Sequence, residues 1–219
     1  MAYKVRKILW VDTETTSDKE DGGEIHEISF IYEEDGLIVE ENTFFARPDA
    51  LDPENVASGK VQEIDPEALA VSGVTMEALA DPDRLSQTEL YKKLSAMLNR
   101  HVDKYNKKDK ITMAGHRVHF DRLFMSTLWL RKGDVYFGGL VDFKSELLIT
   151  SPMQLWESCT GNSVPRFDLS KIAATFGITF EAHTPMADIR VAREVYYRML
   201  EDIEEAKFFA KAERPYYRM

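Results

Sequence analysis

The sequence has few of the features that mark membrane, secreted or low-complexity proteins. It contains one cysteine, Cys159, which excludes a disulfide within the chain and a cysteine metal cluster. No apolar run is long enough to cross a bilayer, and Asp12 and Glu14 interrupt the stretch in which a signal segment would lie. The 11 glycines and 8 prolines are too few for a linker-rich chain. We therefore expect a cytoplasmic protein in a reducing compartment, with no membrane association.

The composition of the 219 residues is that of a globular protein, with 44% hydrophobic and 30% charged residues. We find no internal repeat and no linker-like segment, so we expect a single domain over residues 1–219, with a core at about 7–200. The net charge of −10 argues against a general polyanion binder. Acidic side chains dominate residues 1–90, however, and basic ones are in excess in residues 91–219. This asymmetry is typical either of nucleic-acid contact or of two oppositely charged solvated faces.

The pattern of apolar residues predicts a mixed-sheet α/β domain. The apolar run at 8–11 predicts a buried central strand that stops at Asp12, and the alternation in 25–46 predicts a hairpin. Apolar stretches at 111–114 and 140–143 predict a fourth and a fifth strand. Helical periodicity is expected from Ser86 to about Tyr105, after Gly115, over most of 144–182, and from Thr184–Pro185 to Pro215. For residues 48–90 we expect only short helical pieces.

Four acidic residues stand at predicted element ends. Asp12 and Glu14 follow the first strand with a spacing that puts both side chains on one face, and Asp121 and Asp188 lie in the first turns of two helices. Each feature alone has an ordinary explanation, because exposed carboxylates are common and acidic residues favour helix N-termini. If they converge at the ends of the strands, they repel one another unless cations compensate. Oxygen ligands of this type suit Mg²⁺ or Mn²⁺.

Three histidines lie near these carboxylates. His183 precedes the last helix and has the intrinsic pKa range to take a proton from a water near neutral pH, although it is also explained as an ordinary loop residue. His116 and His119 flank Asp121, and we expect both to support the site or the fold rather than to bind metal.

Three segments of the chain, in this order, resemble the motifs of the DnaQ-like (DEDDh) 3′–5′ exonucleases. Residues 11–16 (VDTETT) resemble the first motif, residues 115–121 (GHRVHFD) the second, and residues 183–188 (HTPMAD) the third in its histidine form. Residues 71–75 resemble the loop that lines the nucleotide pocket of this family. Residues 164–178 have a local resemblance to the catalytic domain of bacterial exonuclease I. Arg117, Ser17 and Ser72 differ from the residues that are common in this family. These differences affect the details of substrate binding, and none of them replaces a metal ligand.

The resemblance implies a ribonuclease H-like fold, with a mixed five-stranded sheet flanked by helices, and hydrolysis assisted by two Mg²⁺ or Mn²⁺ ions. By position, Asp12 would bridge both ions, Glu14 and Asp188 would complete one site, and Asp121 would support the other. His183 would be the general base. The candidates for substrate binding are Thr15, Val74 and Phe120 at the terminal nucleotide and Arg117 at a phosphate.

The function that follows is 3′–5′ exonucleolytic release of nucleoside 5′-monophosphates, with single-stranded DNA favoured over RNA as substrate. The alternatives are an exoribonuclease and a non-catalytic, polymerase-associated nucleic-acid-binding module. A protein partner in DNA replication or repair would fit either. A basic stripe could follow a nucleic-acid backbone or could be a solvated face; it consists of Lys92, Lys93, Arg100, Lys104, Lys107, Lys108 and Lys110. The tail at 205–219 could dock a partner or be a disordered terminus.

Overall fold

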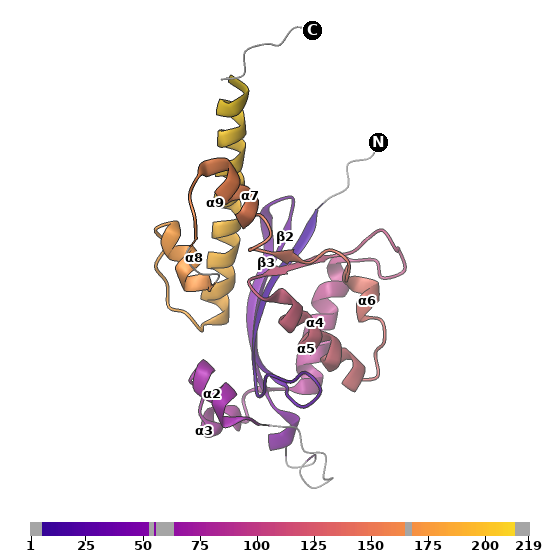
Figure 1. The fold of residues 1–219 in the computed structure, drawn as a ribbon. Coiled ribbons are helices and arrows are strands. Elements are labelled where there is room, and N and C mark those ends of the chain that lie inside the picture. Colours follow the sequence, from indigo (N-terminus) through magenta and orange to yellow (C-terminus); the bar gives the residue numbers. More distant parts are fainter. Residues whose placement is uncertain (1–5, 53–54, 56–63, 165–167, 213–219) are drawn as a thin grey trace.

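The fold is a mixed sheet with helices on both faces, as expected (Figure 1). The computed structural model describes residues 6–52, 55, 64–164 and 168–212. In this part of the chain the six strands have the order β4-β3-β2-β1-β5-β6. They are β1 (Lys7–Thr15), β2 (Ile25–Glu34), β3 (Leu37–Arg47), β4 (Leu85–Ser86), β5 (Thr112–Gly115) and β6 (Leu147–Leu148). The helices are η1 (Asp49–Leu51), α2 (Pro66–Ser72), α3 (Met76–Leu79), α4 (Gln87–His101), α5 (Val118–Arg131), α6 (Phe137–Leu140), α7 (Met153–Thr160), α8 (Leu169–Thr175) and α9 (Pro185–Ala212).

The central strand β1 divides the hydrophobic core into two layers. It pairs antiparallel with β2 and parallel with β5. Leu9 and Val11 point to one layer, which α4, α5 and α6 cover. Ile8 and Trp10 point to the other layer, where α7, α8 and α9 pack. All four side chains are at most 1% exposed, so the apolar run at 8–11 is a strand buried on both faces, as predicted.

The parallel pairing of β1 and β5 brings the segments after both strands to the same edge of the sheet. The close approach depends on Gly115, because a Cβ atom at this position would lie 2.9 Å from the carbonyl oxygen of Val11. A side chain there would push β5 away from β1. Helix α5 starts directly beyond Gly115, at Val118, so its first turn lies beside the end of β1.

The strand predicted at 140–143 is wrong in its position. Leu140 ends helix α6, and Val141 forms only an isolated bridge with Ile111. Asp142 prevents the strand from continuing, because its carboxylate accepts hydrogen bonds from the backbone N–H of Lys144 and the hydroxyl of Ser145 and so closes a turn. The next strand is β6. With the two-residue strands β4 and β6, the sheet has six strands within the described residues rather than the five predicted.

The first residues of the helices were predicted more accurately than the last ones. Helix α4 starts after Ser86 and Pro185 is the first residue of α9, as predicted. The structure adds a complete capping box between Ser86 and Glu89. Helix α4 ends at His101 instead of about Tyr105. Residues 144–182 are less helical than expected, since only α7 and α8 form there. The predicted stop at Pro215 and the segment 213–219 lie outside the described residues. None of the described helices combines the length and the apolar character that a membrane span requires.

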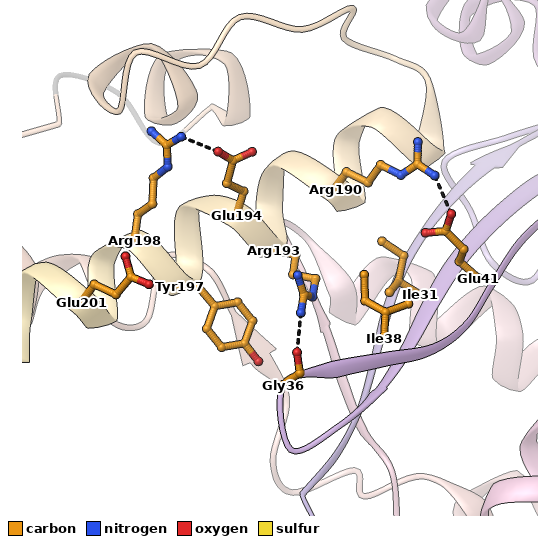
Figure 2. Close-up of a pocket in the computed structure, with 10 residues that line it drawn as sticks. All are labelled: Ile31, Gly36, Ile38, Glu41, Arg190, Arg193, Glu194, Tyr197, Arg198 and Glu201. Atoms are coloured by element: carbon orange, nitrogen blue, oxygen red, sulfur yellow. Dashed lines mark hydrogen bonds and ion pairs between the residues drawn. The ribbon is translucent and has the colours of Figure 1, made fainter.

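A buried ion pair fixes α9 to the hairpin of β2 and β3. Glu33 is fully buried and accepts hydrogen bonds from Arg193 Nε at 2.6 Å and from the Tyr197 hydroxyl at 2.5 Å. Arg193 also donates to the carbonyl of Gly36 at 2.7 Å, within a groove of about 590 Å³ between α9 and the hairpin (Figure 2). Because α9 is one continuous helix, these contacts also determine where its first turn lies.

We expect Arg193→Met to lower the free energy of unfolding by about 3–5 kcal/mol, because it leaves the buried Glu33 carboxylate without its cation. The matched control is Arg190→Met on the same helix. Arg190 pairs with Glu41 in an exposed ion pair, whose loss should cost about 1 kcal/mol or less. Urea unfolding of both variants measures the difference. Equal losses of stability would show that Glu33 and Arg193 do not hold α9 in place.

Candidate functional site

The end of β1 presents carboxylates on one face and a threonine on the other. Side chains alternate along the strand, so Asp12 and Glu14 continue the face of Trp10, on which α9 packs. Thr13 points to the opposite face, toward α5. The Asp-x-Glu spacing therefore places both carboxylates toward the N-terminus of α9 and leaves Thr13 for the first turn of α5.

Thr13 holds the carboxylate of Asp121 by two hydrogen bonds. The backbone N–H of Thr13 donates to Asp121 Oδ1 at 2.8 Å, and its hydroxyl donates to the same oxygen at 2.7 Å. Asp121 is 3% exposed. Burial raises the pKa of Asp121 to about 7, and the hydrogen bonds from Thr13 oppose this shift. Oδ2 takes no part in these two bonds, so it is the oxygen that Asp121 can present to a ligand.

Asp188 enters the site from the first turn of α9. Burial raises its pKa to about 6, although the charge and the backbone of His183 act in the opposite direction. Its Oδ1 atom is buried and has no hydrogen-bond partner among the described residues. His183 itself is exposed and adopts a left-handed backbone with φ of 65°. This conformation is strained for a residue with a side chain, and it turns the chain just before α9 begins.

The predicted catalytic residues line one pocket of about 620 Å³. Apart from these residues, the lining contains the neighbouring Thr13, Thr15, Asp18, His116, Arg117, Phe120, Asp168 and Ser170 and the apolar Ala68, Val71, Leu169, Phe180 and Ala182. The five predicted residues are Asp12, Glu14, Asp121, His183 and Asp188, and they come from three separate segments of the chain. The sequence therefore brings the carboxylates and the histidine to one concave place.

The carboxylates of this pocket act on one another electrostatically. The pKa of Asp12 is raised well above its usual range by burial and by the negative charges of Asp121, Asp188 and Glu14. The pKa of Glu14 rises to about 7 through burial and the charges of Glu27 and Asp188. Carboxylates grouped in this way keep protons that isolated carboxylates would lose, unless a bound cation stabilises their charged forms.

Three of the four predicted substrate-binding residues line the pocket, and Val74 does not. Phe120 lies at the pocket with its ring 4.7 Å from that of Phe124, so it is fixed at one side by the core. Arg117 is exposed at the start of α5. The Thr15 hydroxyl donates to the carbonyl of Ser17 at 2.8 Å. Instead of Val74, the described lining includes Val71, from the same short segment.

Sequence reasoning missed Thr13 and Glu27, while the expectation that His116 supports the site stays a prediction. The alternation along β1 could have assigned Thr13 to the face of Asp121. Glu27 lies directly opposite Glu14 in the register of β1 and β2, which no pattern within one segment reveals. His116 lines the pocket; burial and the neighbouring Arg117 lower its pKa, and its Nδ1 atom is buried without a hydrogen-bond partner among the described residues.

The donor set has the chemistry of a hard-cation site, but its side chains do not form a closed one. No group of three or more His, Cys, Asp or Glu side chains in the described part of the chain is arranged so that it could hold a metal ion. Carboxylate oxygens are nevertheless the preferred ligands of Mg²⁺ and Mn²⁺. The buried and unpartnered Oδ1 of Asp188 is an acceptor that a cation would satisfy.

No protein-family model and no curated protein matches the chain. Solved structures match it through the fold. Exonuclease I from Methylocaldum szegediense superposes with a TM-score of 0.70 at 19% identity, over 95% of this chain and 43% of that protein. Escherichia coli exonuclease I in complex with a dT13 oligonucleotide gives 0.69 at 15% identity, over 94% and 43%. A zinc-bound form of the E. coli enzyme with single-stranded DNA gives 0.68, over 94% and 42%.

The chain thus spans less than half the length of these exonuclease I proteins. At such low identity the similarity establishes the architecture and not the activity. The described residues, with their six-stranded sheet and their helices on both faces, have the ribonuclease H-like fold that exonuclease I has.

Proposed function

We propose that this protein is a metal-dependent 3′–5′ exonuclease that hydrolyses single-stranded DNA from its 3′ end and releases nucleoside 5′-monophosphates. One observation carries the proposal: Asp12, Glu14, Asp121, His183 and Asp188 line a single pocket. These residues are also the ones that the sequence motifs select. The similar folds in complex with single-stranded DNA and a dT13 oligonucleotide support the choice of substrate.

Asp12, Glu14, Asp121 and Asp188 would hold two Mg²⁺ or Mn²⁺ ions. Such ions neutralise the carboxylates and stabilise the charge that develops on the attacking and leaving oxygens of a phosphodiester. The protein's part is to prepare the ligands. Thr13 keeps Asp121 in one orientation through Oδ1, while the groove contacts of α9 fix the helix that carries Asp188 (Figure 2).

His183 would act as the general base, taking a proton from the attacking water. An imidazole suits this step because it gains and loses a proton near neutral pH. Its exposed position in the pocket lets water reach the ring. The nearby Asp188 carboxylate would stabilise the imidazolium that results, since the two groups already interact electrostatically.

The remaining lining would hold the end of the strand. Phe120 offers an aromatic face on which a base can stack with little regard to its identity. Arg117, exposed at the pocket, would bind a phosphate. Val71 and Thr15 would contact the terminal nucleotide, whereas Val74 does not line the pocket.

A 5′-labelled oligonucleotide tests the activity directly. With Mg²⁺ or Mn²⁺ the wild type should give a ladder of shortening products, and EDTA should abolish it. Asp12→Asn should lower the rate by at least about 100-fold, with unfolding no easier than in the wild type, because the substitution relieves repulsion among carboxylates. Asp18→Asn, an exposed carboxylate of the same pocket, is the matched control and should retain activity.

Binding of the oligonucleotide without any shortening would contradict the proposal and favour a non-catalytic module. Cleavage of an RNA oligonucleotide in preference to DNA of the same sequence would favour the exoribonuclease.

The metal-free protein should become less stable as pH rises from about 4 to about 7. Burial raises the pKa values of Glu14 and Asp121 to about 7 and that of Asp188 to about 6. Over this range the native state holds protons that the unfolded state has lost, so the free energy of unfolding falls as pH rises. Saturating Mg²⁺ should raise the melting temperature most at pH 8, where these carboxylates are ionised.

Melting curves at pH 5, 6, 7 and 8, with and without Mg²⁺, measure this effect. Two groups outside the pocket also contribute: Glu24, whose pKa is raised to about 7, adds to this slope, and His26, whose pKa is lowered to about 4 by burial, opposes it. The Asp12→Asn variant therefore serves as reference, and its slope should be shallower. A Mg²⁺ effect that is equal in both proteins would argue against metal binding in the pocket.

His183→Gly separates the role of the imidazole from that of the backbone. Glycine adopts the left-handed φ of 65° without strain, so the variant should be as stable as the wild type or more stable. Its rate should fall by about 100-fold or more, while its affinity for Mn²⁺ stays close to that of the wild type. Single-turnover rates and Mn²⁺ titrations check this outcome, and an unchanged rate at neutral pH would refute the role of His183 as base.

A further inference from the structure

A surface away from α9 combines exposed aromatic rings with basic side chains. Tyr105 is 83% exposed, Tyr136 61% and Phe143 46%. They belong to two loops, one after α4 and one around α6, at the side of the molecule where Figure 1 shows α6. We call this the aromatic–basic surface; it comprises these three rings with Lys104, Lys107, Lys108, Lys110, Arg122 and Lys144.

The rings and the cations of this surface are in contact. The Nζ atom of Lys104 lies 5.5 Å from the ring centroid of Tyr105 and 5.7 Å from that of Tyr136, so it joins the two loops. Arg122 lies 5.0 Å from the ring of Phe143. The surface thus has the alternation of π-faces and positive charges that is typical of single-strand binding proteins.

The two loops are held firmly to each other. Lys110 Nζ donates to the carbonyl of Gly138, and the N–H of Ile111 donates to the carbonyl of Leu140 at 3.0 Å. The two loops also pack at contact distance at Gly139, where a Cβ atom would lie 3.5 Å from the carbonyl oxygen of Lys104. The exposed rings therefore stand on an ordered base, which lowers the entropy that a ligand would lose on binding.

Acidic side chains near the aromatic–basic surface interact with other side chains of the protein, whereas several of its lysines form no ion pair within the described residues. Asp109 pairs with Lys7 at 2.6 Å, and Glu146 pairs with Arg122 of the surface itself. Asp134 accepts a hydrogen bond from the neutral Tyr91 hydroxyl at 2.7 Å and so keeps its negative charge. Lys107, Lys108 and Lys144 are exposed and form no ion pair within the described part of the chain. The surface can therefore offer positive charge to an anionic partner despite the net charge of −10.

The basic stripe predicted between Lys92 and Lys110 falls into two parts in the structure. Arg100 is engaged by Glu40 at 2.6 Å, and Lys93 lies over the ring of Phe44, both on the side of α4 that faces β3. Only the part from Lys104 onward joins the exposed rings. Arg122 follows Asp121 in α5 and is the part of this surface that is nearest to the pocket in the sequence. The loop that carries Tyr105 precedes β5 and therefore lies toward the opposite edge of the sheet, so a strand held at both places must be long enough to pass along α5.

We infer that the aromatic–basic surface binds the segment of a single-stranded DNA that lies on the 5′ side of the nucleotide held in the pocket. This inference rests on the proposed function and specifies how its substrate is held. Phosphates lie against Lys107, Lys108 and Lys144, and bases stack on Tyr105 and Tyr136. Affinity then increases with oligonucleotide length until the surface is covered, and it falls as salt rises.

Fluorescence anisotropy tests this in EDTA with labelled dT5 and dT30, on the 219-residue chain carrying Asp12→Asn. For dT30, we expect Tyr105→Ala/Tyr136→Ala to weaken binding by about fivefold or more, and Lys107→Glu/Lys108→Glu to weaken it by about tenfold and to flatten the salt dependence. Binding of dT5 changes little in either variant. The matched control, Lys92→Glu/Lys93→Glu on α4, makes the same change in net charge and leaves dT30 binding within about twofold of the parent.

The inference is overturned if the control weakens dT30 binding as much as the lysine variant does, if the tyrosine variant binds like the parent, or if the parent binds no single strand. Circular dichroism melts confirm that each exposed substitution leaves the fold intact. If the nuclease assay shows no shortening but dT30 binding still depends on the aromatic–basic surface, the proposed activity is wrong and the binding surface stands. If the oligonucleotide is shortened but the surface variants bind dT30 like the parent, the binding surface is wrong and the proposed activity stands.

Discussion

The arrangement of this protein depends on the cost of placing several carboxylates together at the end of a buried strand. Asp12 continues the run that fills the core, so its side chain leaves the hydrophobic layer directly beside α9. Asp121 and Asp188 arrive from helices on opposite faces of the sheet, and burial and mutual repulsion disfavour their charged forms. A fold that maintains such a cluster needs compensation, which the proposed ions would supply and which Thr13 and His183 supply in part.

The scaffold meets this cost with rigid elements. Gly115 permits β5 to lie against β1, and the first turn of α5 follows at once. On the other face, the buried pair of Glu33 and Arg193 holds α9. The strained backbone conformation of His183 lies just before α9 and is maintained by these fixed elements. Helix α5 contributes Asp121 to the pocket from its buried side and Arg122 to the aromatic–basic surface from another side, so the two share one helix.

Local patterns predicted the parts of the fold that depend on local physics. The apolar run of β1, the hairpin, the start of α4 at Ser86 and Pro185 at the start of α9 follow from periodicity and backbone chemistry. The strand predicted at 140–143 was misplaced because the hydrogen bonds of Asp142 close a turn there, which the apolar pattern does not reveal. The two-residue strands β4 and β6 are too short to show an alternating pattern. The pocket residues were selected by motifs, whereas Thr13 and Glu27 required knowledge of packing and register between distant segments. The roles of Val74 and the tail at 205–219 remain predictions.

Anomalous diffraction from crystals grown with Mn²⁺ shows whether Asp12, Glu14, Asp121 and Asp188 bind divalent cations together. We expect two anomalous peaks in the pocket, about 4 Å apart, within coordination distance of these four carboxylates and close to His183. Peaks elsewhere on the molecule with an empty pocket at saturating Mn²⁺, or carboxylates that stay apart with no shared ion, would show that the four carboxylates do not form a metal site.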